Sequence, residues 1–299
     1  MGDSKSLISL GDLTKPANTL IEKISDAIGE VFKPYQIVRV AQAEARAETI
    51  RAATQIKVTE LQRRAVRRFI MEEAKKQNNI ETITGKALPY VDEQARPEEV
   101  EDDWIVDFFD KCRLISDEEM QNLWARILAG EANSPGKFSK RTIDLVASMD
   151  KSDASLFSNL CSFGVVWDRI YVLIYDVNAK MYVDHEINFT SLCHLDSIGL
   201  VHFENSKGYV RQYLPKRITL DYFGQQVYLE FPNIENNKFR VGKVILTKAG
   251  NDLAPICSAA LQDGFVDYLR ENWKRFGYTI EPQNEAPVSE HGTPASSGH

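Results

Sequence analysis

The fold of this chain is decided by the stretch Trp104–Phe163, WIVDFFDKCRLISDEEMQNLWARILAGEANSPGKFSKRTIDLVASMDKSDASLFSNLCSF, which divides into four short helical patterns. Ser116 followed by Glu119 predicts a capping box at the start of the second helix, because each side chain can accept from the other's backbone N–H. We expect Gly130 to end that helix, since glycine readily takes the left-handed conformation that follows many helices.

The third helix has an equally clear start. Ser139 is a suitable cap, and Phe138 before it can contact Ile143 as a hydrophobic staple. The fourth helix is expected to begin at Ser152. Apolar side chains at helical spacing predict a compact core that contains Trp104, Phe108, Phe109, Leu123, Trp124, Ile127, Phe138 and Ile143.

Charged residues in the same stretch could in principle serve phosphoryl-transfer or nuclease chemistry. These are Glu118, Glu119, Arg126, Glu131, Lys140, Arg141 and Asp144. Such residues are more often helix caps and ion pairs, and the sequence has no Gly-rich phosphate loop, GxSxG or HExxH motif. We therefore predict no catalytic residue and no cofactor. A cryptic nuclease or hydrolase is the third-ranked hypothesis for function.

Charge and composition limit the classes of function. The 299 residues carry a formal net charge of -7 with a pI near 5.4, so the whole molecule is not expected to attract nucleic acid. A nucleic-acid site would need a local basic patch. The four cysteines are far apart and form no CxxC motif, which predicts free thiols in a reducing compartment. No secretory signal or spanning apolar run is found, so the expected location is the cytoplasm.

Two helices are predicted before the compact domain. Thr14 and Pro16 favour the start of an amphipathic helix that ends before Pro34 and packs on protein or lies on a membrane surface. From Tyr35 to about Asn79 there is neither glycine nor proline, which predicts one long helix. Its apolar residues recur at eleven-residue intervals, which favours a bundle of copies of this helix. The predicted coiled-coil-like oligomer interface contains Ala47, Ile50, Val58, Leu61, Phe69 and Ile80.

The densest positive charge lies within that long helix, in the run RRAVRR that begins at Arg63. Its four arginines share one side of the helix, so they form a solvated face paired with nearby glutamates or contact a nucleic-acid backbone. No aromatic residue is interleaved with them, which disfavours single-strand binding. The predicted nucleic-acid-binding residues on this helix are Arg63, Arg64, Arg67 and Arg68.

After Gly164 the pattern changes to β-branched and aromatic residues. A short helix before Gly199-Leu200, followed much later by Leu246-Thr-Lys-Ala-Gly250, predicts a winged-helix-like module with a long wing over residues 201–246. The expected recognition helix has no lysine or arginine, so protein contact or a structural role is favoured over DNA reading. Basic wing residues that could contact nucleic acid are Lys207, Arg211, Lys216, Arg217 and Lys243. The histidines and cysteines have no zinc-site spacing, and no metal is expected.

Together these patterns predict a mostly helical α+β protein. Its expected segments are an N-terminal amphipathic helix at 1–34, a long oligomerising helix with a hinge at 35–96, a compact four-helix core at 97–164, a winged-helix-like module at 165–280 and a disordered tail at 281–299.

Three runs of sequence resemble a known family. They are RRAVRRFIMEEAKKQNNIETI at 63–83, EDDWIVDFFDKCRLISDEEMQ at 101–121 and LWARILAGEANSPGKFSKRTIDLVASMDKSDASLF at 123–157. They are similar to an uncharacterised bacterial domain-of-unknown-function family over most of residues 15–280. Residues from roughly 90 to 165 also resemble the abortive-infection alpha group of anti-phage proteins. The family has no established catalytic residues, and the resemblance implies a role in phage defence.

We therefore predict a non-enzymatic, oligomeric assembly or sensor protein of bacterial anti-phage defence that acts through protein–protein contacts. The alternative is a nucleic-acid-binding regulator that uses the arginine-bearing helix and the basic wing. Expected partners are copies of the same chain and a protein of the defence system, with nucleic acid and peripheral membrane contact left open.

Overall fold

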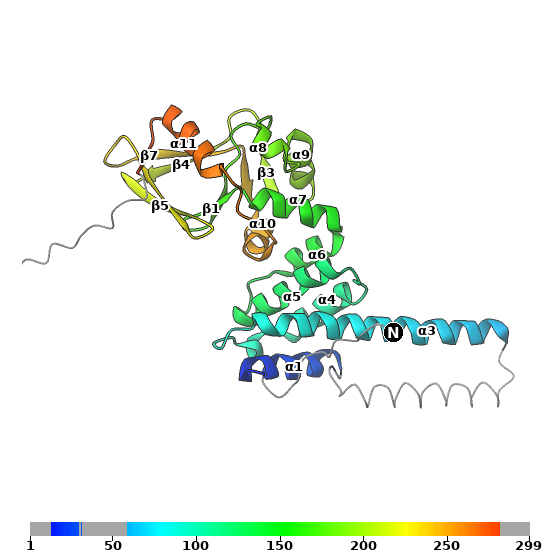
Figure 1. Cartoon of the computed structure of the whole chain (residues 1–299). Helices are drawn as coiled ribbons and strands as arrows, with labels where there is room; N and C mark the ends of the chain where they lie inside the picture. The colour runs from blue at the N-terminus through cyan, green and yellow to red at the C-terminus, as the bar shows by residue number, and fades with distance from the viewer. Residues whose placement is uncertain (1–12, 30, 32–58, 282–299) are drawn as a thin grey trace, which may run out of the picture. The chain divides into compact units, whose positions relative to one another are not determined.

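The structure is a computed structural model that describes residues 13–29, 31 and 59–281 (Figure 1). The chain is mixed α+β, as the sequence predicted. It divides into two compact units, and each unit is assembled from separated segments. The first comprises Met1–Ser158, Cys193–Val201 and Thr247–Ser258, and the second comprises Asn159–Leu192, His202–Leu246 and Ala259–His299. Of the predicted tail at 281–299, Glu281 belongs to a strand, and residues 282–299 lie outside the described residues.

The described part of the first unit is helical. Its complete elements are α1 (Lys15–Ile28), α3 (Glu60–Ala87), η2 (Leu88–Tyr90), η3 (Pro97–Glu99), α4 (Asp102–Cys112), α5 (Glu118–Asn133), α6 (Lys140–Ser148), α10 (Lys248–Leu253) and η4 (Ala254–Ile256). Helix α3 packs on α5, α1 packs on α4, and α6 contacts both α4 and α10. No helix in the described residues is long and apolar enough to cross a membrane.

Helix α1 begins where the sequence predicted. The Thr14 hydroxyl accepts a hydrogen bond from the Ala17 N–H, and Pro16 occupies the first turn. Leu20 and Ile24 are fully buried, and Lys23 pairs with Asp102 of α4 at 2.6 Å. The apolar face of α1 therefore packs on its own chain, and membrane contact stays a prediction.

The long helix differs from its prediction at both ends. Thr59 has an extended backbone (φ -61°, ψ 153°) and forms a capping box with Gln62, so α3 begins at Glu60. The prediction of one uninterrupted helix from Tyr35 is therefore wrong, because Thr59 is not helical. Residues 32–58 lie outside the described part. The helix also continues through Gly85 to Ala87, because this end is buried against the rest of the unit. Burial outweighs the low helix propensity of one glycine.

Helix α5 also departs from its predicted boundaries. Asp117, not Ser116, caps it, and its carboxylate accepts from the Glu119 and Met120 N–H groups, both at 3.0 Å. The Ser116 hydroxyl instead contacts buried Asn79 of α3. Gly130 lies inside α5, where a Cβ atom would come within 2.8 Å of the Phe138 ring. That glycine therefore permits close packing and does not end the helix.

The next two helix starts follow local side-chain chemistry. Ser139 caps α6 by accepting from the Thr142 N–H, as the sequence predicted. Helix α7 (Lys151–Cys161) begins one residue before the predicted Ser152. Asp150 and Asp153 cap it reciprocally, since each carboxylate accepts from the other's backbone N–H.

An aromatic cluster forms the centre of the first unit. Phe108 stacks on Trp104 at 5.0 Å between ring centroids and meets the Trp124 ring edge-on at 5.1 Å. The buried Trp104 Nε1–H donates to the Phe138 carbonyl at 2.7 Å. Leu123 is only half-buried. The other predicted core residues are buried: Trp104, Phe108, Phe109, Trp124, Ile127, Phe138 and Ile143.

The second unit is built on β-structure. Its elements include β1 (Gly164–Val166), β2 (Ile170–Val172), α8 (Lys180–Val183), β4 (Tyr209–Leu214), β5 (Arg217–Tyr222), β6 (Gln225–Glu230), β7 (Asn237–Gly242), β8 (Val244–Leu246), α11 (Phe265–Arg275) and β9 (Thr279–Glu281). Five antiparallel strands form one sheet in the order β2-β1-β5-β6-β9, and β4 pairs with β7 in a separate antiparallel ribbon. Buried residues alternate along β5 and β7, which is the pattern of a half-covered sheet.

The elements around the predicted winged helix are present. Helix α9 (Phe189–Ser197) is followed by Gly199 in a left-handed conformation (φ 84°) and by β3 (Val201–Phe203). At the other end of the wing, the Thr247 hydroxyl accepts from the Gly250 N–H at the start of α10 and donates to the Gly199 carbonyl at 2.7 Å. Assignment to the winged-helix class stays a prediction.

Candidate assembly surface on helix α3

The first half of α3 presents its side chains to solvent. Leu61, Phe69 and Met71 are 70%, 63% and 63% exposed, which is unusual for large apolar residues on one helix. In the second half of the same helix, Ile83 and Ala87 are fully buried. Figure 1 shows the first half of α3 running past the ends of α4 and α5, which cover only the second half.

The exposed apolar residues continue the buried face of α3. With about 100° between successive residues of an α-helix, Leu61, Ala65 and Phe69 lie on the same side as Ile83 and Ala87. We call Leu61, Ala65, Val66 and Phe69 the apolar stripe. The side of α3 that packs on α5 in its second half is therefore uncovered, among the described residues, in its first half.

The predicted oligomer interface is only partly described. Leu61 and Phe69 lie on the apolar stripe, whereas Ile80 is half-buried in the part of α3 that packs on the first unit. Three further members lie outside the described residues: Ala47, Ile50 and Val58.

The four arginines of α3 divide into two groups. By the same angular spacing Arg63, Arg64 and Arg67 lie opposite the apolar stripe, whereas Arg68 lies at its edge. Arg68 pairs with Glu72 at 3.4 Å, and Arg63 pairs with Glu60 at 3.2 Å. Arg64 and Arg67 are exposed and form no ion pair with a described residue.

The basic residues of the wing are mostly engaged with neighbours. Arg211 pairs with Asp168 at 2.7 Å and lies over the Trp167 ring at 4.6 Å. Burial opposes ionisation of Asp168, but the hydrogen bond from Arg211 holds its pKa below the usual value. Other wing pairs are Lys216 and Arg217 with Glu230, each at 3.1 Å, and Lys243 with Asn205 at 2.8 Å; Lys207 is exposed.

The charged residues weighed as catalytic candidates serve separate structural contacts. Glu131 is 3% exposed, and its two oxygens accept from the Gly136 N–H at 2.6 Å and the Phe138 N–H at 2.8 Å. Burial raises the pKa of this carboxyl above its ordinary value. The remaining contacts are Asp144 with Lys111, Glu119 with Lys151, Arg126 with the Ile256 carbonyl and Glu118 beside Lys86; Lys140 and Arg141 are exposed.

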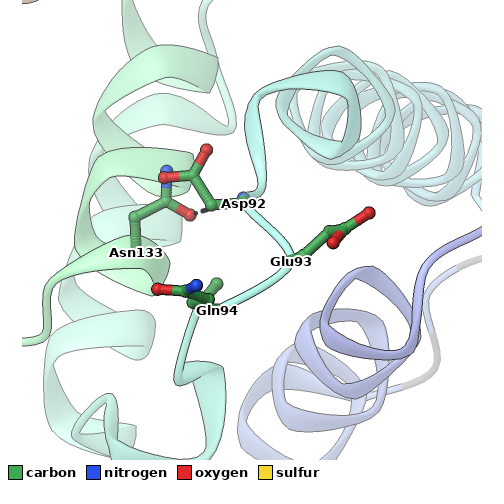
Figure 2. Close-up of a pocket in the computed structure, with 5 residues that line it drawn as sticks. Asp92, Glu93, Gln94 and Asn133 are labelled. Atoms are coloured by element: carbon green, nitrogen blue, oxygen red, sulfur yellow. Dashed lines mark hydrogen bonds between the residues drawn. The ribbon is translucent and has the colours of Figure 1, made fainter.

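A shallow hollow of about 420 Å³ lies beside the loop that comes after α3 and η2 in the chain. The sequence predicted this loop only as a hinge. Asp92, Glu93, Gln94 and Asn133 line it, and Figure 2 shows Glu93 pointing away from Asn133. The Asn133 side chain accepts from the Asp92 N–H and donates to the Tyr90 carbonyl, both at 2.9 Å. Its amide therefore holds the loop in place. In the described part of the chain, no cluster of His, Cys, Asp and Glu is arranged to hold a metal ion.

Comparison with known proteins identifies a family. A family model described as "Protein of unknown function (DUF2806)" matches residues 63–270, well over half of the chain. Neither a curated protein nor a solved structure matches. The expected membership of a domain-of-unknown-function family is confirmed, whereas similarity to abortive-infection proteins stays a prediction. The match begins at Arg63 and so includes most of the exposed half of α3. This chain belongs to the DUF2806 family.

Proposed function

We propose that this chain is an assembly protein that associates with a second copy of itself through the apolar stripe of α3. The observation that carries the proposal is the exposure of Leu61 and Phe69 on a helix face that is otherwise buried. A second copy carries an equal stripe, so the same patch can serve both sides of a two-fold interface.

The energetics favour association of moderate strength. The exposed first half of α3 is a short helical segment, and such a segment is marginal by itself in water, so packing on a partner would also stabilise it. Burying a leucine or phenylalanine side chain contributes about 1.5–3 kcal/mol, or about 6–12 kcal/mol for Leu61 and Phe69 from both copies. This gain is comparable with the cost of association, about 4–15 kcal/mol. The largest gain less the smallest cost leaves about 8 kcal/mol, which corresponds to a micromolar dissociation constant, so we expect association no tighter than micromolar that single substitutions on the stripe disrupt.

The charges beside the stripe favour an antiparallel pair. If Phe69 of each copy lies near the two-fold axis, Arg68 approaches the partner's Glu72 on the same flank, and the reverse pair forms by symmetry. In this register Leu61 lies about 12 Å from the axis and packs beside the partner's residue 77, beyond the partner's stripe. A parallel pair would instead bring Glu72 towards the partner's Glu73, which is repulsive. Charge complementarity thus supports a second, antiparallel copy of the chain as the partner that covers the apolar stripe.

The test is the mass of the full-length chain in solution. We expect a concentration-dependent dimer or larger assembly for the wild type, and a monomer for Phe69→Glu and Leu61→Glu, measured by light scattering after gel filtration. Leu114→Glu is a matched control, because Leu114 is 64% exposed but lies on the loop after α4. A monomeric wild type at high micromolar concentration would refute self-association. So would an assembly that the two stripe variants leave intact.

The proposed biological role is bacterial anti-phage defence of the abortive-infection type, with assembly acting through protein–protein contacts. The support for this role is the resemblance of the helical core, and it needs a separate test. Expression of the wild type should lower phage yield in a sensitive bacterial host, and Phe69→Glu should abolish the protection. Equal phage yields with and without the wild-type chain would refute the defence role and leave the assembly proposal standing.

A further inference from the structure

We infer that the outward side of α3 binds the phosphate backbone of a nucleic-acid duplex. This side carries Arg63, Arg64, Arg67 and Lys75, which we call the arginine face. Its three arginines lie opposite the apolar stripe, and Lys75 lies beside Arg64 on the flank between the two sides, so a bound duplex and a second copy of the chain occupy different sides of the helix. The inference does not depend on self-association.

The spacing of the arginine face suits a polyanion. Arg63 and Arg67 are four residues apart, which is about 6 Å of helix rise, Arg64 lies between them, and Lys75 extends the face by about 12 Å. Duplex DNA carries about one negative charge per 1.7 Å of its axis, so several phosphates lie within reach along this length. Arginine suits such contacts because its planar guanidinium can donate two parallel hydrogen bonds to one phosphate.

The side chains of the arginine face are available. All four are exposed, and Arg64, Arg67 and Lys75 form no ion pair with a described residue. The pair of Arg63 with Glu60 joins side chains that are 60% and 66% exposed, so water screens it and it is easily exchanged for a phosphate. The face is therefore a local positive surface on a chain whose formal net charge is -7.

Two other polyanionic partners fit less well. A helix that lies on a membrane needs a continuous apolar side opposite its basic side, and Glu72 and Glu73 interrupt the stripe of α3. Single strands are held largely by bases stacked on aromatic rings, and the only aromatic residue of α3 is Phe69, on the opposite side. A duplex contacted through its backbone requires neither feature.

The experiment measures binding of the full-length chain to short labelled DNA and RNA duplexes across a salt series. Four phosphate contacts predict that the logarithm of the DNA affinity falls with the logarithm of salt with a slope of about -3.6. Arg64→Glu with Arg67→Glu should remove at least two contacts and reduce the slope to about -1.8, with a large loss of affinity at low salt. Arg64→Gln with Arg67→Gln should cause a smaller loss in the same direction.

The matched control is Lys140→Glu with Arg141→Glu, which reverses two exposed charges on α6 of the same unit. The inference is supported if duplex binding survives in this control and in Phe69→Glu but is lost in Arg64→Glu with Arg67→Glu. Equal loss in both charge-reversal variants would overturn it, because net charge alone would then explain binding. Binding to anionic phospholipid vesicles but to neither duplex would also overturn it, as would no measurable duplex binding at low salt. Circular dichroism of each variant checks that the fold is retained.

Discussion

The carboxylate of Glu131 offers the sharpest test of how the helical core is held together. Its two oxygens accept from the Gly136 and Phe138 N–H groups, so it ties the loop after α5 to the helix itself. Glu131→Ala leaves both donors without this acceptor. Leaving a buried N–H donor unpaired costs about 1–3 kcal/mol of folding free energy. The Phe138 N–H is buried and should cost the most, whereas the Gly136 N–H is partly open to water and should cost less. We expect a total loss of about 3 kcal/mol.

Urea denaturation followed by tryptophan fluorescence measures this loss. With a slope of about 2 kcal/mol per molar urea, the unfolding midpoint should fall by about 1.5 M. Glu119→Ala is the control on the same helix, because Glu119 pairs with Lys151 at the surface and its loss should cost about 1 kcal/mol or less. If Glu131→Ala unfolded at the wild-type midpoint, the carboxylate would not hold the loop.

The same residue predicts a pH dependence. Burial raises the pKa of Glu131 in the folded state, so the folded chain binds more protons than the unfolded chain between the two pKa values. Stability of the wild type relative to Glu131→Gln should therefore fall as pH rises from about 4.3, the ordinary glutamate value, and level off above the folded pKa. A difference that grew with rising pH would contradict this assignment.

Two further predictions concern the second unit. Gly242→Ala should lower the free energy of unfolding of this unit by about 2–3 kcal/mol, because φ is 110° and the new Cβ would lie 2.5 Å from the Ile174 carbonyl oxygen. Urea denaturation measures this loss, and a loss below about 0.5 kcal/mol would contradict the close approach. Tyr222→Phe removes a hydroxyl that donates to the Ser162 carbonyl at 3.0 Å and accepts from the Gln262 N–H at 2.8 Å. We expect a loss of about 1–3 kcal/mol, and an unchanged unfolding midpoint would show that water replaces the hydroxyl.

Local signals in the sequence located the starts of α1 and α6 correctly. Thr14 and Ser139 cap these helices because each hydroxyl reaches an N–H only three residues away. Where two neighbouring residues could cap a helix, the prediction of Ser116 was wrong. Asp117 caps α5 because Ser116 is drawn to Asn79, which is 37 residues away in the chain.

The sequence likewise predicted only part of the candidate assembly surface on α3. Spacing alone placed Leu61 and Phe69 on an apolar side of α3 and identified the run of arginines. It could not show which part of that side is covered, since this depends on where α5 lies against α3. It also could not show that Arg211, Lys216 and Arg217 are held by carboxylates from other strands or loops.

By itself, the sequence determined the α+β class, the aromatic core of the helical unit and the arginine-bearing helix, because helical spacing and capping act within a few residues. Only the tertiary structure decided that Gly130 permits packing of Phe138, that Glu131 serves a loop and that half of α3 is uncovered. These features depend on residues brought together from different elements, so no local pattern in the chain specifies them.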